Sequence, residues 1–326
     1  MIRTVLNLLS PAAGQARLSI LIFHRVPAEP DPLFPGECDA ARFDRMLGWL
    51  RNWFNVLPLG EAVQRMTEDR LPARAAVITF DDGYADNATE ATPLLRKHGL
   101  SATFFVSAGF LDGGCMWNDG VIETLRRTRR EHIDLSALDP ALPQESLPLS
   151  ALEQRRNTIG RVLGSFKYLP AEQRLKLVAR LAELCELDLP RGLMMDADQL
   201  RGMQAAGMTI GAHTMTHPIL ATLDDAAAWS EITESQRVLE GVIGRRVGLF
   251  AYPNGKPGQD YSLRSVELVR EAGFDAAVAT AWGTATRETD RFQLPRFTPW
   301  DLGRNRFAAR MAQNLARRET LPPLLV

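Results

Sequence analysis

The sequence predicts an α/β fold in which helices cover a mainly parallel sheet. Short, fully apolar runs alternate with amphipathic helical segments along most of the chain. Strands that are apolar on both faces are typical of a parallel sheet buried between helices. Polar residues suited to catalysis follow several of these runs directly. That placement fits the rim of a β/α barrel and also the crevice of an open α/β sheet, so it does not separate the two.

The first third of the chain contains three predicted strands, at residues 18–23, 75–80 and 101–106. Helices are predicted at residues 39–53 and 60–68, and a third ends at His98-Gly99. Asp86 is expected to cap the start of this third helix, and a glycine after the last turn is typical of a helix C-terminus. These elements follow the strand-helix alternation of the predicted sheet.

Charged helical sequence dominates from about residue 118 to 193. A proline-containing break at 139–148 precedes a long helical stretch from Ser150 to Glu186, and no strand of convincing length is visible. We interpret residues 118–193 as a helical insertion between two strands.

The alternation resumes after the insertion. The predicted strands lie at residues 208–211, 247–252, 276–279 and 292–297, and the predicted helices at 196–206, 224–243, 261–272 and 305–316. We therefore expect a helical lead-in at residues 1–17, one α/β domain at 18–305 that contains the insertion, and a C-terminal helix and tail at 306–326.

Composition excludes several classes of protein. The 326 residues carry a net charge of −1, which gives no reason to expect nucleic acid or an acidic membrane surface as a partner. Cys38, Cys115 and Cys185 are scattered, which argues against a disulfide framework and favours a reducing compartment. No apolar run approaches the roughly 20 residues of a transmembrane helix, and the first apolar run is short for an export signal. A cytoplasmic location is expected.

Two short segments indicate the chemistry. Thr79-Phe80-Asp81-Asp82-Gly83 and His213-Thr214-Met215-Thr216-His217 each follow a strand-like run. One aspartate and two histidines make three protein ligands that leave a position open for water on a divalent ion, and the other aspartate is free to accept a proton. Taken singly, the aspartates suit a turn and the histidines a capped loop. Together they indicate metal-assisted hydrolysis, with Zn²⁺ preferred and Co²⁺, Ni²⁺ or Fe²⁺ also suited to the ligands.

The flanking residues resemble the polysaccharide deacetylase family, which is the NodB-homology group or carbohydrate esterase family four. The similarity is carried by TFDDGYADN at 79–87, TFFV at 103–106 and HTMTHP at 213–218, and it extends from about residue 18 to 300. It implies a distorted (β/α) barrel of about seven strands that removes acetyl groups from N-acetylated sugars with a metal ion. The segment Phe23-His24-Arg25-Val26 resembles the subgroup that acts in exopolysaccharide and surface-glycan biosynthesis.

The resemblance also implies roles for individual residues. Asp81 falls on the general base of the family, and Asp82, His213 and His217 fall on the metal ligands. The backbone N–H of Tyr84 falls on the group that helps to hold the oxyanion.

Two departures from the family pattern matter. The stretch at 249–255, LFAYPNG, lacks the arginine that orients the base in many relatives, and Arg296 is a candidate to replace it by pairing with Asp81. No histidine follows His217 to act as the late general acid, so His24 is a candidate for an acid or a substrate ligand. Arg296 also suits an ordinary ion pair, and His24 a structural hydrogen bond.

Further residues are candidates for substrate contact. Tyr252, Pro253 and Asn254 lie beside the expected pocket, where a backbone restricted by proline suits a substrate wall. Trp300 is a candidate for stacking on a sugar ring, as are Trp117 and Trp282, although each tryptophan also suits a core position.

We therefore expect an N-acetylated saccharide as the substrate. Two alternatives remain open: hydrolysis of a non-sugar amide or formyl group by the same mechanism, and a glycan-binding module with weakened chemistry. The missing arginine and the missing late histidine motivate the second alternative.

Overall fold

The computed structural model describes residues 2–299 and 303–317. The chain forms two compact units. The first contains the segments up to Glu29, from Cys38 to Leu111 and from Met195 onward, and the second contains Pro30–Glu37 and Asp112–Met194. Each unit has a hydrophobic core of its own.

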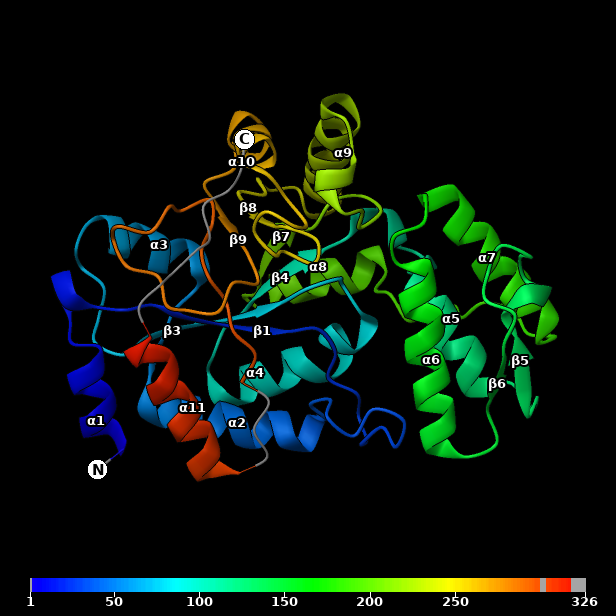
Figure 1. Cartoon of the computed structure of the whole chain (residues 1–326). Helices are drawn as coiled ribbons and strands as arrows, with labels where there is room; N and C mark the ends of the chain where they lie inside the picture. Colours follow the sequence, from blue (N-terminus) through cyan, green and yellow to red (C-terminus); the bar gives the residue numbers. More distant parts are fainter. Residues whose placement is uncertain (1, 300–302, 318–326) are drawn as a thin grey trace. The chain divides into compact units, whose positions relative to one another are not determined.

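The first unit is built on one curled parallel sheet of seven strands (Figure 1). Its strands are β1 (Ser19–Phe23), β2 (Asn55–Val56), β3 (Ala75–Phe80), β4 (Thr103–Val106), β7 (Thr209–Ala212), β8 (Leu249–Ala251) and β9 (Ala276–Val278). Their order is β1-β3-β4-β7-β8-β9, and β2 pairs with β3. The α/β class with a parallel sheet is confirmed. The sequence analysis missed β2, which has only two residues.

The segment at 292–297, predicted as a strand, does not form a continuous ladder. Leu294 makes a single parallel bridge to Val278 of β9, and Phe297 makes one to Leu21 of β1. Pro295 between them has no N–H to donate, which prevents a regular ladder. The segment nevertheless links the two end strands of the sheet order, and the curled sheet forms the distorted barrel that the family resemblance implied.

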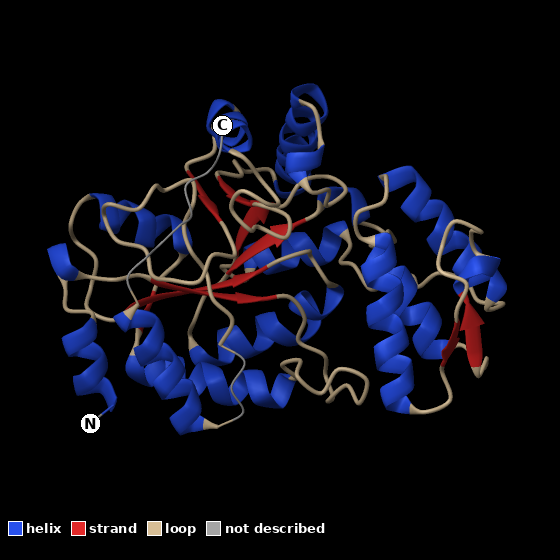
Figure 2. Ribbon diagram, viewed as in Figure 1, coloured by secondary structure: helices blue, strands red, loops and turns tan. Residues whose placement is uncertain are grey.

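Helices surround this sheet (Figure 2). They are α1 (Ile2–Leu9), α2 (Ala40–Trp53), α3 (Leu59–Thr67), α4 (Thr92–His98), α8 (Ala197–Ala205), α9 (Asp225–Ile243), α10 (Leu263–Glu271) and α11 (Arg304–Ala316). Short 3₁₀ turns occur at Ala13–Gln15, Ala108–Phe110 and Leu220–Thr222. The Asp39 carboxylate caps α2 at the N–H of Arg42, and Gly99 ends α4 in the left-handed conformation, as its position predicted.

The expected cap at Asp86 is wrong. A π-helix at Asn87–Ala91 precedes α4, and the Asp86 side chain makes no capping bond to it. Its carboxylate instead accepts hydrogen bonds from Arg25 Nε at 2.9 Å and from the N–H of Val26 at 3.2 Å. This carboxylate therefore fixes the segment that follows β1.

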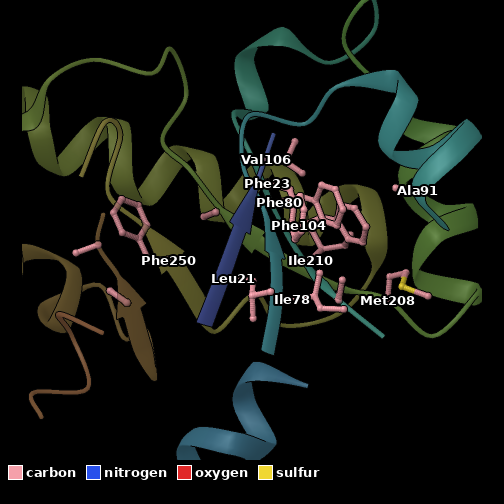
Figure 3. Close-up of a cluster of buried hydrophobic side chains, with 14 of the residues drawn as sticks. Leu21, Phe23, Ile78, Phe80, Ala91, Phe104, Val106, Met208, Ile210 and Phe250 are labelled. Atoms are coloured by element: carbon pink, nitrogen blue, oxygen red, sulfur yellow. The ribbon is translucent and has the colours of Figure 1, made fainter. Parts of the chain in front are cut away.

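Alternate residues of the strands enter two different cores. Phe23, Phe80 and Phe104 belong to the core between sheet and helices (Figure 3), with ring centroids 5.3 Å apart for Phe23 and Phe80 and 4.7 Å for Phe80 and Phe104. Ile20 and Val77 belong to the second core inside the barrel. This two-residue period explains why the strands are apolar throughout. The aromatic stack fixes the strand ends from which the candidate site residues follow.

The second unit contains α5 (Trp117–Arg127), β5 (His132–Asp134), β6 (Ser146–Pro148), α6 (Leu152–Phe166) and α7 (Ala171–Leu184), with a 3₁₀ turn at Leu135–Ala137. Its core includes Val121, Ile159, Phe166 and Leu181. The predicted long helix is two helices separated at Pro170, which precedes the first residue of α7. The antiparallel pair β5–β6 was missed, because each strand has only three residues.

The second unit also contains residues 30–37, which the predicted insertion did not include. Across the described ranges, no helix is long and apolar enough to span a bilayer.

Candidate active site

A tight turn follows β3 and separates two adjacent carboxylates. Asp82 has φ of 76° and Gly83 has φ of 90°, and the Gly83 N–H donates to the carbonyl of Asp81 at 3.0 Å. A Cβ atom on Gly83 would lie 2.9 Å from Cγ1 of Val106. Glycine is therefore required by both conformation and space. The turn allows the side chains of Asp81 and Asp82 to meet different partners.

Asp82 faces two histidines at the end of β7. Its Oδ1 lies 3.5 Å from Nε2 of His213 and 3.5 Å from Nε2 of His217. The three donor atoms all lie within 4.8 Å of one another. The structure thus brings together the three ligands predicted from the sequence. Asp82 lies 131 positions before His213 in the chain.

These three residues could hold a metal ion, and two of their distances are compatible with zinc bonds. Bonds of about 2.0–2.2 Å in tetrahedral geometry place ligand atoms about 3.3–3.6 Å apart, which matches the nitrogen-oxygen distances of 3.5 Å. Nδ1 of His213 lies 2.7 Å from the carbonyl oxygen of Ala251. A carbonyl only accepts, so Nδ1 carries the proton and Nε2 keeps its lone pair for an ion.

The second carboxylate is held by an arginine. Nη1 of Arg296 lies 2.6 Å from Oδ1 of Asp81, and Nη2 lies 2.7 Å from Oδ2. The same guanidinium donates to the carbonyl of Ala279 at 3.0 Å and to the hydroxyl of Thr79 at 3.2 Å. Both members of the pair are buried. Such a two-pronged contact fixes the plane of the carboxylate as well as its position.

The charges around the site adjust the pKa values. Burial opposes ionisation of Asp81, but Arg296 and His213 outweigh it and hold the pKa of Asp81 below its usual range. Burial acts in the same way on Asp82, whose pKa is lowered by His213 and His217. Both carboxylates are therefore ionised at neutral pH.

The pKa values of the two histidines shift in opposite directions. Burial lowers the pKa of His217 to about 4, so its ring is neutral and ready to bind an ion. Burial also disfavours charge on His213, but Asp81 and Asp82 outweigh this effect and raise its pKa. Binding of an ion at His213 therefore competes with a proton.

The loop that carries the histidines is held by a residue that the sequence analysis missed. Oε2 of Glu231, on α9, accepts hydrogen bonds from the N–H groups of Met215 at 2.8 Å and Thr216 at 2.9 Å. Its Oε1 accepts from the Thr216 hydroxyl at 2.7 Å. Thr214 and His217 both have positive φ, so the loop needs such support. Nothing distinguishes Glu231 in the sequence from the other acidic residues of its helix.

His24 and Tyr84 lie close to this cluster. His24 directly follows β1, its carbonyl accepts a hydrogen bond from Nδ2 of Asn87 at 2.8 Å, and its ring affects the pKa of Asp81 and Asp82. Tyr84 follows Gly83 and is buried, with the guanidinium of Arg25 5.0 Å from its ring centroid. The catalytic roles expected for His24 and Tyr84 stay predictions.

The structure places Tyr252 in the core. Its hydroxyl donates to the carbonyl of Phe292 at 3.0 Å, and its ring stacks on Tyr261 with centroids 4.0 Å apart. The side chain is fully buried, so it offers no surface to a substrate. Pro253 is also buried, whereas Asn254 is partly exposed, with φ of 58°. Among the side chains of Tyr252, Pro253 and Asn254, only that of Asn254 is therefore exposed enough to contact a substrate.

Three tryptophans were candidates for stacking on a sugar ring. Trp300 lies outside the described residues. Trp117 begins α5 of the second unit, and the partly exposed ring of Trp282 lies beside Arg310 and Arg317. Stacking of Trp300 on a sugar stays a prediction.

The family model described as polysaccharide deacetylase matches residues 68–136 and 172–277, more than half of the chain. Among curated proteins, the chain is 22% identical over 283 residues to the putative polysaccharide deacetylase YxkH of Bacillus subtilis (strain 168), covering 86% of this chain and 71% of that protein.

Solved structures show the same fold. IcaB from Ammonifex degensii superposes with a TM-score of 0.58 at 16% identity, covering 92% of this chain and 97% of the other. The Streptococcus pyogenes deacetylase PplD, solved in complex with acetate, gives a TM-score of 0.56 at 17% identity, covering 87% and 92%. Because the sequence identities are this low, the superpositions show only that the folds are similar.

Proposed function

The chain belongs to the polysaccharide deacetylase family, and we propose that it is a metal-dependent hydrolase that removes N-acetyl groups from an N-acetylated sugar in a polysaccharide or glycan precursor. One observation carries the proposal. Three metal-binding donors, from Asp82, His213 and His217, converge beside a second carboxylate, Asp81, that an arginine holds in place.

Asp82, His213 and His217 would hold the ion, with zinc the best match to two imidazoles and one carboxylate, and cobalt, nickel or iron also suited. A bound ion supplies Lewis-acid polarisation of the amide carbonyl. Asp81 accepts the proton of the attacking water, because Arg296 keeps it ionised and oriented.

The remaining steps use groups beside this pair. The N–H of Tyr84 stabilises the oxyanion that forms on the acetyl carbonyl. We assign the donation of a proton to the departing amine to His24, because it directly follows β1 and its charge lowers the pKa values of both Asp81 and Asp82. The products are acetate and a free amino sugar.

Acetate release from N-acetylated hexosamine oligomers, with and without chelator, tests the proposal. We expect Asp81→Asn to lower kcat by about 10²–10⁴-fold while retaining the metal, and His213→Ala to lose the metal. Metal content is measured on the purified proteins.

The proposal fails if His213→Ala retains a full equivalent of metal, or if chelator leaves acetate release unchanged. Hydrolysis of formamides without release of acetate from any sugar would instead assign a non-sugar amide as the substrate. Tight glycan binding by metal-loaded protein without acetate release would assign a binding module.

A further inference from the structure

Two helices of the first unit carry basic residues without acidic ones. Helix α1 contains Arg3, and α11, which packs against it, contains Arg304, Arg306 and Arg310. Neither helix contains Asp or Glu. Over residues 2–299 and 303–317, no ion pair is formed by Arg3, Arg304 or Arg306. Positive charge therefore accumulates on one side of a chain whose net charge is only −1.

Arginines on three other helices of the same unit form ion pairs with neighbouring carboxylates. On α8, Arg201 pairs with Asp198. On α9, Arg237 pairs with Glu234 at 2.7 Å, and on α10, Arg264 pairs with Asp225, Glu267 and Glu271 at 2.7–3.1 Å. The arginines of α1 and α11 thus differ from those of α8, α9 and α10, although Arg45 and Arg51 on α2 and Arg96 on α4 are also exposed and form no ion pair among the described residues.

Apolar side chains are exposed beside these charges. Leu8 of α1 is 78% exposed and Val5 is 47% exposed. A cavity of about 360 Å³ next to α1 is lined by Leu8, Leu9, Arg17 and Arg287 together with one acidic residue, Glu288. Nη1 of Arg17 donates to the carbonyl of Leu315 at 2.5 Å, which connects this cavity to α11. Apolar and cationic side chains therefore line the same cavity.

A buried arginine bonded to the residue after α1 forms no ion pair among residues 2–299 and 303–317. Arg74 is 7% exposed, and its Nε has no hydrogen-bond partner in the described part of the chain. Its backbone N–H donates to the carbonyl of Ser10, which directly follows α1. Burial and the nearby charge of Arg3 lower the pKa of Arg74. An uncompensated buried charge is costly, so an anion from outside the chain would stabilise this arrangement.

We propose that this surface, made of α1, α11, Arg17 and Arg74 and named here the α1–α11 face, docks on a lipid bilayer that carries anionic headgroups. Val5 and Leu8 enter the boundary between headgroups and acyl chains, and the arginines contact lipid phosphates. An apolar contact and a cationic contact on one short helix favour a bilayer over a free anion, because a free anion would leave Val5 and Leu8 in water.

The face and the candidate active site lie at opposite ends of β3. Arg74 directly precedes the first residue of the strand, and Asp81 directly follows its last. Six residues at about 3.3 Å each separate the two ends by roughly 20 Å. Docking therefore leaves the candidate active site uncovered, and substitutions on the face are expected to leave hydrolysis of a soluble substrate unchanged. The inference does not depend on the proposed function.

Co-sedimentation of the full chain with vesicles tests the proposal. We expect binding to phosphatidylcholine vesicles that contain about 30% phosphatidylglycerol, much weaker binding to pure phosphatidylcholine, and loss of binding at high salt. Arg306→Glu is expected to weaken binding by about fivefold or more, because each basic residue at such a surface contributes about 1 kcal/mol. Leu8→Glu is expected to weaken binding as well, because it removes an inserted apolar side chain and adds a negative charge.

Matched controls carry the same changes elsewhere. Leu175→Glu replaces a leucine that is 57% exposed on α7, and Arg245→Glu replaces an exposed arginine after α9. Both are expected to bind vesicles as the unchanged protein does. Arg74→Met is expected to weaken binding and to raise the melting temperature, a combination that loss of folding cannot produce.

Three results overturn the proposal. The first is equal binding to neutral and anionic vesicles. The second is equal loss of binding in Arg306→Glu and Arg245→Glu. The third is an Arg74-dependent rise in melting temperature with inorganic phosphate while no vesicle binds, which would assign a site for a free anion.

Discussion

The pair of Arg296 and Asp81 is the residue-scale feature on which the proposed chemistry of the site depends. The two side chains come from positions 215 residues apart and meet through two hydrogen bonds in a buried environment. Many relatives place the arginine in a segment that reads LFAYPNG at 249–255 here. In this chain the guanidinium comes instead from the segment at 292–297, which forms single bridges to β9 and β1.

Removing that arginine is expected to move the pH dependence of hydrolysis. The guanidinium favours the ionised form of Asp81, so its loss raises the pKa of the base, and more of the base is protonated at a given acidic pH. We expect Arg296→Met to shift the acidic limb of the kcat/KM profile upward by about 1–3 pH units. Arg296→Lys keeps the positive charge but cannot make both hydrogen bonds to the carboxylate in the same geometry, so it should give a smaller shift of the acidic limb.

Arg296→Met also leaves a buried carboxylate without a partner, at a cost of about 3–5 kcal/mol, which denaturant unfolding measures. If that variant fails to fold, Arg296→Lys still provides the test. An acidic limb at the same pH in the lysine variant and the unchanged protein would contradict the role of Arg296 in setting the pKa of Asp81.

The convergence of the three predicted ligands could be predicted from the sequence, although their roles stay predictions. Asp82, His213 and His217 follow strand ends in a parallel sheet, and such ends meet at one edge, so their convergence could be expected from the sequence. Tyr252 also follows a strand end, yet its ring turns into the core and stacks on Tyr261. The sequence contains no signal for which side of the chain faces the pocket at that position.

At the scale of elements, α9 supports the loop that carries both histidines. Glu231 accepts three hydrogen bonds from Met215 and Thr216, in a loop where two residues have positive φ. The bonds hold the backbone between the two predicted ligands and do not touch their rings. Glu231 is therefore a positioning residue, and its effect is expected on affinity for the ion.

Glu231→Ala is expected to weaken metal affinity by about 10–100-fold, the range found when groups that orient ligands are removed. Glu231→Gln should restore most of it, because an amide oxygen can still accept from both N–H groups. Titration calorimetry of metal-free protein gives the affinity directly. Glu234→Ala on the same helix removes an exposed carboxylate that pairs only with Arg237, and it should have no effect.

Long, strongly patterned elements were predictable, and short or interrupted ones were not. The strand at 75–80 has the predicted bounds, and α4 ends before Gly99 as predicted, although it begins at Thr92 and not next to Asp86. The pair β5–β6 was missed because three-residue strands show no period, and 292–297 was assigned as a strand although Pro295 interrupts its ladder. Asp86 was assigned as a cap because its long-range bond to Arg25 leaves no trace in the local sequence.

At the scale of the whole molecule, summed charge conceals how the charge is distributed. The net charge of −1 gave no reason to expect an acidic surface as a partner. In the described part of the folded chain, Arg3 on α1 and Arg304 and Arg306 on α11 form no ion pair, while Arg237 on α9 and Arg264 on α10 pair with neighbouring carboxylates. Composition cannot reveal this distribution, because it depends on which helices the fold places together.

The two units are also expected to differ in their response to metal. Phe166 is fully buried in the core of the second unit, whereas all three predicted metal ligands belong to the first. We therefore expect calorimetry to resolve two unfolding transitions, of which only one moves on chelation. A metal concentration 100-fold above the dissociation constant stabilises the bound unit by about 2.7 kcal/mol, and removal of the metal reverses that gain.

Phe166→Ala identifies the other transition, because truncation of a buried phenylalanine costs about 3–5 kcal/mol in the core that contains it. This variant should lower the transition that chelator leaves in place and spare the one that chelator moves. A single transition that both treatments shift together would show that the units unfold as one cooperative body, and the separate cores would then not define separate folding units.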